Sequence, residues 1–331
     1  MAEGKKIGII GGGSWATALV KILSFRTNVN WWLRDTDQID QIRKFRHNPK
    51  YLTSVEFDLE KINLFESLQE LISTSDILVL AVPSAFCHST LNKISKSDLD
   101  GKIIFSAVKG IIPEYNLIVG EYLNSVYDIP FENIGVITGP CHAEEVAMEK
   151  LSYLTVASNK IQNAETLAEN LRCRFIKVTC SDDIYGTEYS AVLKNVIAVA
   201  GGICHGLGYG DNFLSVLISN AIQEIERFVN EAHPISRDIK ASAYLGDLLV
   251  TAYSQFSRNR MFGTMIGKGY SVKMAQLEMN MVAEGYYAVK CVHEINKKLK
   301  VNMPITEAVY NIVYEKISPA LEIKLLCDKL S

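Results

Sequence analysis

The sequence predicts an α/β protein with an N-terminal Rossmann-type doubly wound sheet, residues 1–182, followed by an all-helical domain, residues 183–331. Three observations support this prediction. Short apolar runs alternate with helical patterns over the first half, a glycine-rich turn follows the first run, and strand-like runs cease near residue 180. A chain of 331 residues is also long enough for about two domains.

Seven apolar runs predict the strands. They are rich in β-branched residues and apolar on both faces, which is typical of a covered parallel sheet. The runs are 6–10, 29–33, 77–82, 102–108, 133–138, 152–157 and 175–179. Segments such as 14–25, 36–46, 66–73 and 163–172 have helical patterns between them. This alternation favours a doubly wound fold.

The sequence changes character after Ser181-Asp182-Asp183, which has the composition of a helix N-terminus. Helical patterns follow at 183–200, 211–230, 236–255, 272–279, 281–299 and 304–315. They predict that the second domain is helical throughout.

The bulk composition disfavours several classes of function. A formal net charge of −3 gives no basic field for nucleic acid. Seven cysteines without a CxxC pair indicate neither a disulfide framework nor a zinc site, so no metal is expected. The apolar runs are too short for a membrane span, and IGII at 7–10 is too short for a signal peptide. We therefore expect a cytoplasmic protein, and a homodimer is a reasonable expectation.

A glycine turn, Gly11-Gly12-Gly13-Ser14-Trp15-Ala16, follows the first run and opens a helical pattern. It has the form G-x-G-x-x-A. Gly11 allows the tight turn, Gly13 lets a pyrophosphate approach the backbone, and a small third residue lets helix and strand pack closely. The helix N-terminus then faces the phosphates. A turn that serves packing alone is the competing interpretation.

The second run ends in Leu33-Arg34-Asp35. An acid at this place bonds the ribose hydroxyls of NAD, whereas an arginine accommodates the 2′-phosphate of NADP. Arg34 favours NADP(H), and Asp35 leaves NAD(H) open. Alternatively, Arg34 is a solvated surface charge.

Ligands of such sheets bind beyond the carboxyl ends of the strands. Lys109 lies at such an end before a glycine, so its ammonium can point toward a ligand, although a surface lysine is the alternative. Cys141 and His142 follow another strand, but no acid is placed to orient the histidine. Cysteine–histidine catalysis is therefore disfavoured.

Lys194 stands in the middle of an apolar stretch, EYSAVLKNVIAVAGG at 188–202. Its helical neighbours are mostly small, which allows a ligand or another backbone to approach. A buried ammonium needs a partner, and a desolvated lysine exchanges its proton more readily, which suits acid–base chemistry. The alternative is a lysine that extends along the helix to solvent.

Other polar groups interrupt the helical half. Asp247 either caps a helix or tunes the buried lysine. Arg258 and Asn259 either grip a phosphate with forked N–H donors or belong to a charged loop. Glu284 can cap a helix or reach a ribose or an amide.

These residues together resemble the bacterial NAD(P)-dependent glycerol-3-phosphate dehydrogenases. The similarity spans nearly the whole chain through GGGSWATAL, AVPS, VKGI, GPCHAEEVA, LKNVIAVAGGI, GLGYGDN, GDLLVT, SRNRMFG, VAEGY and MPITEAVY. The chain departs from the family at Cys141, where a serine or threonine is common, at Thr53 in the N-x-x-Y-L-P element, and in ISNAIQEI, where relatives carry Arg-Gly.

The resemblance implies roles for particular residues. The implied cofactor contacts, besides Gly11 and Gly13, are Ser14, Trp15, Arg34, Lys109, Ala143, Arg258, Val282 and Glu284. The implied substrate contacts are Lys109, Gly139, Cys141, Lys194, Asp247, Ser257, Arg258 and Asn259. Lys194 matches the proton-transfer lysine, and Lys109, Asn195, Asp247 and Thr251 match its supporting polar residues.

The implied reaction is reversible reduction of dihydroxyacetone phosphate to sn-glycerol 3-phosphate by NADPH or NADH, which supplies phospholipid synthesis. Two other interpretations stay open. One is a 3-hydroxyacid or 6-phosphogluconate-type dehydrogenase, which SRN and GDLLVT disfavour. The other is a non-catalytic NADP-binding sensor, which the joint presence of Lys109, Lys194 and Asp247 disfavours.

Overall fold

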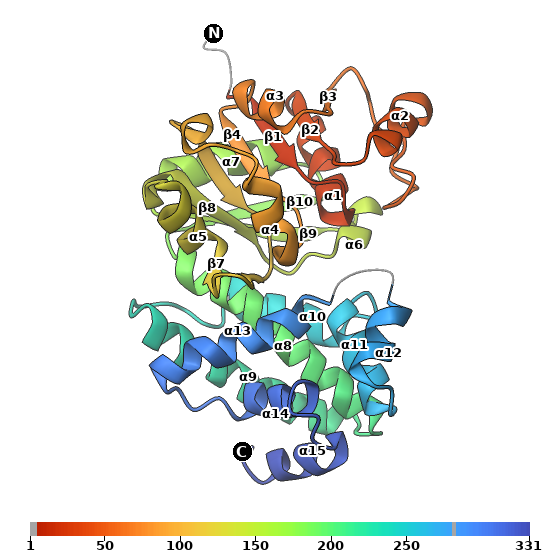
Figure 1. Cartoon of the computed structure of the whole chain (residues 1–331), viewed down its shortest axis with the longest axis vertical. Coiled ribbons are helices and arrows are strands. Elements are labelled where there is room, and N and C mark those ends of the chain that lie inside the picture. Colours follow the sequence, from red (N-terminus) through yellow and green to blue (C-terminus); the bar gives the residue numbers. More distant parts are fainter. Residues whose placement is uncertain (1–4, 280–282) are drawn as a thin grey trace. The chain divides into compact units, whose positions relative to one another are not determined.

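The computed structural model describes residues 5–279 and 283–331 (Figure 1). The chain forms two compact units. The first comprises the described residues up to Val82, Phe86–Val108 and Val119–Ile184. The second comprises Pro83–Ala85, Lys109–Ile118 and the described residues of Tyr185–Ser331. Two short segments of the first half of the chain therefore belong with the helical unit.

The first unit contains an eight-stranded sheet with strand order β10-β9-β8-β5-β4-β1-β2-β3. Its strands are β1 (Ile7–Ile10), β2 (Val29–Trp32), β3 (Ile62–Phe65), β4 (Ile77–Leu80), β5 (Ile103–Ser106), β8 (Ile134–Thr138), β9 (Ser152–Ser158) and β10 (Ile176–Ser181). The seven predicted strands are present, with ends that differ by a few residues. β3 was not predicted, because its outward residues are polar or half-exposed and it lies at the sheet edge.

One part of the predicted sheet is wrong: β9 runs antiparallel to β8, whereas the other neighbouring strands pair in parallel. The helix between them, α6 (Ala143–Ala147), has only five residues and packs against α1 rather than returning along the sheet. The chain therefore re-enters at the end where β8 stops. A strand that is apolar on both faces gives no sign of its direction in the sequence.

Helices and short helical turns join these strands. They are α1 (Ser14–Ser24), α2 (Thr36–Phe45), α3 (Leu68–Ser73), α4 (Ser84–Leu91), η1 (Lys96–Leu99), α5 (Val119–Tyr127), η2 (Phe131–Asn133) and α7 (Ile161–Leu171). Strand order reverses between β1 and β4, where the chain winds outward in both directions. Because ligands bind at the carboxyl ends of the strands at such a reversal, the turns after β1 and β4 are the expected binding region.

The helical unit is built around α8 (Ile184–Gly206), whose residues from Thr187 to Cys204 are buried. The remaining elements are α9 (Asp211–Ala232), a π-helical turn η3 (Ser242–Gly246), α10 (Asp247–Tyr253), α11 (Arg258–Gly267), α12 (Val272–Glu278), α13 (Glu284–Leu299), α14 (Pro304–Val313) and α15 (Pro319–Cys327). A short antiparallel hairpin, β6 (Ile111–Ile112) with β7 (Leu117–Ile118), adds apolar side chains to the core of this unit.

Several helical predictions need correction. The single helix expected over 236–255 is a π-helical turn followed by the shorter α10. Helices α11 and α15 were not predicted, and the former begins within the charged SRNR segment. The predicted helix 281–299 corresponds to α13 from Glu284 onward, and positions 281 and 282 lie outside the described residues.

Glycines bring α8 and α11 into close contact. A Cβ atom added at Gly263 would lie 2.1 Å from the carbonyl oxygen of Val199, and one at Gly202 would lie 2.1 Å from that of Arg260. Both distances are far below van der Waals contact, so the two backbones approach as closely as they do only because these side chains are absent. This crossing fixes the start of α11 relative to the polar residues of α8.

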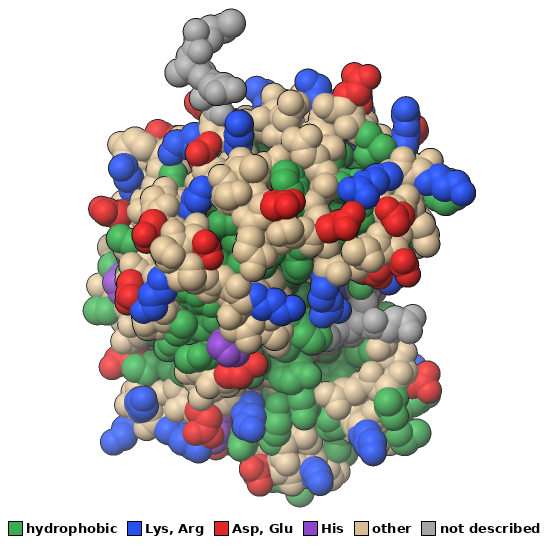
Figure 2. Space-filling view, turned by 45° about the horizontal axis from the view of Figure 1, so that its top comes forward, with side chains coloured by type: hydrophobic (Ala, Val, Ile, Leu, Met, Phe, Trp, Pro, Cys, Tyr) green, Lys and Arg blue, Asp and Glu red, His purple; other side chains and the backbone are tan. Residues whose placement is uncertain are grey.

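Other features of the described chain bear on the class of protein. Among the described residues, no helix is long and apolar enough to cross a membrane. The same residues contain no cluster of three or more His, Cys, Asp or Glu side chains suited to a metal ion. On the face that Figure 2 shows, Lys and Arg side chains lie among Asp and Glu side chains, so their charges offset one another locally.

We predict that Gly263→Ala lowers the free energy of unfolding by about 1–3 kcal/mol, because the added methyl group forces α8 and α11 apart. Gly210→Ser is the matched control. Gly210 caps the N-terminus of α9, and an added Cβ there meets no atom within 4 Å. Urea unfolding of both variants measures the effect. A Gly263→Ala protein as stable as the unaltered chain would contradict the close crossing.

Candidate active site

The turn after β1 is shaped for an anionic group. Gly11 has φ +134°, and a Cβ atom there would lie 2.4 Å from the carbonyl oxygen of Ala81, so only glycine fits. A Cβ atom at Gly13 would meet nothing within 4 Å. Gly13 is also the N-cap of α1, and it supplies no side-chain cap to that helix. An open helix N-terminus beside a bare backbone is the environment that a dinucleotide pyrophosphate requires.

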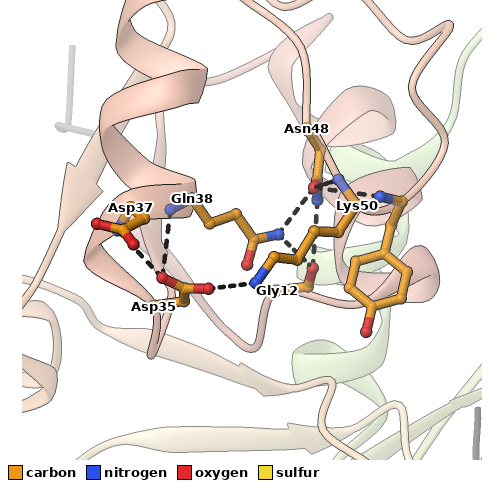
Figure 3. A network of polar contacts seen from close by, with 7 residues as sticks. Gly12, Asp35, Asp37, Gln38, Asn48 and Lys50 are labelled. Atoms are coloured by element: carbon orange, nitrogen blue, oxygen red, sulfur yellow. Dashed lines mark hydrogen bonds and ion pairs between the residues drawn. The ribbon is translucent and has the colours of Figure 1, made fainter.

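Two buried side-chain amides hold the main-chain carbonyl of Gly12 within this turn (Figure 3). Gln38 Nε2 donates to Gly12 O at 3.1 Å, and Asn48 Nδ2 donates to the same oxygen at 3.2 Å. Asn48 also donates to Thr17 Oγ1 at 2.7 Å and accepts from Gln38 at 2.8 Å. Sequence analysis missed both residues. The only available signal was the N-x-x-Y-L-P element, which begins at Asn48.

Two charged side chains follow β2, and a third, Lys50, reaches them from the segment after α2. Arg34 is exposed, and its guanidinium lies 6.0 Å from the centre of the Phe86 ring. Asp35 is the N-cap of α2 and accepts from the backbone N–H groups of Asp37 and Gln38. Its other oxygen accepts a hydrogen bond from Lys50. The Lys50 ammonium lowers the pKa of the Asp35 carboxyl, which therefore stays ionised.

The remaining predicted contacts of the first unit follow β8 and β1. Gly139 has φ +119° and is buried, and Cys141 and Ala143 are also buried. Ser14 and Trp15 open α1, directly after the glycine turn. These residues lie at the carboxyl ends of β8 and β1, where ligands of this type of sheet bind.

In the second unit, Lys194 of α8 and Asp247 of α10 form a buried ion pair. Lys194 is 4% exposed, so it does not extend to solvent. Its Nζ donates to Asp247 Oδ1, and Lys109 Nζ lies 3.8 Å from the same oxygen. Asp247 is the first residue of α10. The hydroxyl of Thr251 donates to the main-chain oxygen of Asp247 at 2.7 Å.

The electrostatics of this group decide what Lys194 can do. Burial lowers the pKa of Lys194 to about 7, Asp247 opposes that change, and the second ammonium of Lys109 adds to it. A lysine with a pKa near neutrality can both give and accept a proton in water at neutral pH. Ser190 Oγ, one turn before Lys194, is buried and has no hydrogen-bond partner among the described residues.

A relay of side-chain amides positions Lys109. Asn195 Nδ2 donates to Lys109 O at 2.7 Å, and its Oδ1 accepts from Asn259 Nδ2 at 2.8 Å. Asn259 Oδ1 in turn accepts from the backbone N–H of Gly285 at 2.9 Å. Asn259 therefore uses its oxygen and one N–H inside the protein, and one N–H is left for a ligand.

The start of α11 and the start of α13 hold the other predicted contacts. Ser257 caps α11 by accepting from Arg260 N, and the half-buried Arg258 is the first residue of that helix.

Glu284, the first residue of α13, accepts from both the backbone N–H and the hydroxyl of Ser84. Burial raises the pKa of this carboxyl. A Cβ atom at Gly110 would lie 2.6 Å from Glu284 Oε2 and Ser84 Oγ, so a side chain there would displace this pair. Val282 lies outside the described residues.

The turn after β1 suits a pyrophosphate, and a lysine with a near-neutral pKa suits proton transfer to or from an oxygen. Nicotinamide-dependent dehydrogenases need both properties, and the chain is an oxidoreductase of that class. Two family models agree in detail. Residues 6–164 match the N-terminus, and residues 183–324 the C-terminus, of NAD-dependent glycerol-3-phosphate dehydrogenase. The chain belongs to the NAD-dependent glycerol-3-phosphate dehydrogenase family.

Individual relatives match over nearly their whole length. The chain is 34% identical over 311 residues to glycerol-3-phosphate dehydrogenase (NAD(P)+) of Chlorobium limicola, with 93% of each chain covered. It is 35% identical over 322 residues to the enzyme of that name from Clostridium botulinum, covering 97% of this chain and 96% of the relative. A crystal structure of glycerol-3-phosphate dehydrogenase from Coxiella burnetii superposes with a TM-score of 0.91 at 30% identity and covers 98% and 99% of the two chains.

We predict that Asp247→Ala lowers the free energy of unfolding by about 3–5 kcal/mol, because it leaves a buried ammonium without its partner. The double variant Lys194→Met with Asp247→Leu removes both charges and should recover most of that loss. Urea unfolding at pH 7 measures each free energy. Exposed ion pairs contribute less than about 1 kcal/mol. If Asp247→Ala lowers the free energy of unfolding by less than that, the claim that Lys194 and Asp247 form a buried ion pair is wrong.

Proposed function

We propose that this chain reduces dihydroxyacetone phosphate to sn-glycerol 3-phosphate with NADPH or NADH, and catalyses the reverse oxidation. The relatives named above carry the name glycerol-3-phosphate dehydrogenase, with NAD(P)+ in two of the three names. The observation that carries the proposal is the buried Lys194–Asp247 pair with Lys109 beside it. That arrangement supplies both a proton and positive charge where a ketone oxygen must become a hydroxyl.

The proposed chemistry begins with the substrate ketone beside Lys194. The reduced nicotinamide, when bound, supplies the hydride that adds to C2 of the ketone. Lys194 as the ammonium donates a hydrogen bond to the carbonyl oxygen and then transfers its proton to it. In the oxidation direction, neutral Lys194 accepts the proton of the C2 hydroxyl. General acid–base help of this kind contributes about 10²–10⁴ in rate.

The neighbours of Lys194 have separate tasks in this proposal. Asp247 holds the lysine in place and balances its charge, and Thr251 fixes the main chain of Asp247. The Lys109 ammonium adds positive charge near the developing oxyanion. Asn195 keeps Lys109 in position through the bond to its main-chain oxygen.

Substrate and cofactor are then held by groups of opposite charge. Arg258, with Ser257 and the remaining amide N–H of Asn259, binds the substrate phosphate at the start of α11. Gly139 and Cys141 are proposed as further substrate contacts.

The dinucleotide is proposed to bind at the turn after β1, because an open helix N-terminus and a bare backbone match its pyrophosphate. The contacts proposed there and at the end of β2 are Gly11, Gly13, Ser14, Trp15 and Arg34. The remaining proposed cofactor contacts are Lys109, Ala143, Arg258, Val282 and Glu284.

We also propose the setting in which the reaction runs. Residues 1–182 hold the cofactor, and residues 183–331 carry the proton-transfer lysine. The enzyme acts in the cytoplasm as a homodimer, and its product supplies glycerolipid and phospholipid synthesis. A 3-hydroxyacid dehydrogenase would share the lysine but need no group for a phosphate, and the SRN and GDLLVT segments disfavour a 6-phosphogluconate-type enzyme. A sensor would need no proton donor.

We predict that Lys194→Met reduces the rate of dihydroxyacetone phosphate reduction by about 10²–10⁴ while cofactor binding is retained. The loss of reduced-nicotinamide absorbance measures the rate, and fluorescence titration measures binding. Lys297→Met is the control, because Lys297 is an exposed lysine of the same unit, paired to Glu294 at 2.7 Å. Turnover by Lys194→Met at the unaltered rate would contradict the proposal, as would no turnover of this ketone by a cofactor-binding chain.

The pH dependence follows from the protonation state that each direction needs. Reduction requires protonated Lys194, whose pKa is lowered to about 7, so we predict that kcat for reduction falls as pH rises through that value. Oxidation requires neutral Lys194, so its kcat should rise over the same range. Profiles measured in both directions at saturating substrate check this. Parallel profiles for the two directions would contradict it.

A further inference from the structure

The carboxylate of Asp35 has almost no capacity left for a ligand. A carboxylate offers about four lone-pair positions. Oδ1 accepts from the N–H groups of Asp37 and Gln38 at 3.1 and 3.4 Å, and Oδ2 accepts from Lys50 (Figure 3). Three positions are therefore used within the protein. An acid that serves NAD typically bonds the adjacent ribose hydroxyls, and Asp35 has one position left for that task.

Lys50 also changes the charge at this strand end. Its ammonium neutralises Asp35, whose free charge would otherwise repel an incoming phosphate. Lys50 is held close by the segment after α2: Asn48 Oδ1 accepts from the backbone N–H of Lys50 at 3.1 Å, and Asn48 itself is fully buried against Gly12. The lysine is therefore anchored to the same residue that fixes the glycine turn.

The residue before Asp35 supplies the other half of the subsite. Arg34 is exposed and carries a planar guanidinium that suits a phosphate with two parallel donors. Phe86, which is 42% exposed, lies under that guanidinium. A ring in this position limits where the guanidinium can go and offers an apolar surface to an adenine.

We propose that Lys50 determines the preference for the phosphorylated cofactor: by pairing with Asp35 it leaves Arg34 to bind the 2′-phosphate of NADPH. Lys50 is thus a positioning residue that acts through Asp35, and the subsite takes a ribose 2′-phosphate in preference to a free 2′-hydroxyl. This inference rests on the proposed function only in assuming a nicotinamide cofactor, and it concerns binding rather than turnover.

The test uses adenosine 2′,5′-bisphosphate and adenosine 5′-monophosphate, which carry this end of the two cofactors and undergo no reaction. Isothermal titration of the full chain gives both dissociation constants at fixed ionic strength. Lys50→Met should weaken binding of the bisphosphate about tenfold, the value of one charge-assisted contact, while leaving the monophosphate unchanged or tighter. Lys50→Arg should restore bisphosphate binding.

Two further variants make the result specific. Lys96→Met is the control, because Lys96 forms an exposed ion pair of the same kind with Asp128 in the same unit. In the Asp35→Asn background, Lys50→Met should weaken binding of the bisphosphate by less than about threefold, because the carboxylate charge that repels the phosphate is already gone. An equal loss in both backgrounds would show direct phosphate contact by Lys50 and overturn the inference.

The outcomes also separate this inference from the proposed function. A chain that binds the bisphosphate as predicted but does not reduce dihydroxyacetone phosphate loses only its proposed reaction. An active chain whose Lys50→Met variant weakens both nucleotides equally, or neither, keeps its reaction and loses the inference. An unaltered chain that binds the monophosphate at least as tightly as the bisphosphate also overturns it.

Discussion

The ion pair between Lys194 and Asp247 is the interaction on which the chemistry of this protein depends. An isolated ammonium inside an apolar helix would be strongly disfavoured, and the carboxylate of Asp247 makes its burial tolerable. The pair joins α8 to α10, and Lys109 approaches the same carboxylate oxygen. Two ammonium groups around one carboxylate leave an excess positive charge. This positive charge stabilises the ketone oxygen, which gains negative charge during reduction.

Much of the structure serves to hold these groups still. The glycine contacts between α8 and α11 fix the start of α11, and the Asn195–Asn259 relay ties that start to the main chain of Lys109. In the first unit, Gln38 and Asn48 hold the carbonyl of Gly12 in a similar way. Both sites use buried side-chain amides for positioning, because an amide both donates and accepts without adding charge.

The sequence revealed the features that have a local signal. The glycine turn, the alternation of strands and helices, and a lysine in an apolar helix are each visible within about twenty residues. Contacts between distant positions leave no such signal: Asp247 lies 53 residues from Lys194, and Glu284 lies 200 residues from Ser84. The direction of β9 and the π-helical turn before Asp247 were missed for a related reason. Tertiary packing determines both, and neither changes the local pattern of apolar residues.

The most direct test of the central claim is the pKa of Lys194 itself. Lysine labelled with ¹³C at the Cε atom gives resonances that shift when the ammonium loses its proton, and Lys194→Met identifies the resonance of interest. Burial lowers that pKa to about 7, so the resonance should titrate near neutral pH, far below the ordinary value for lysine of 10.5. Titration of Lys194 at the ordinary value would contradict its assignment as the group that exchanges a proton with the substrate.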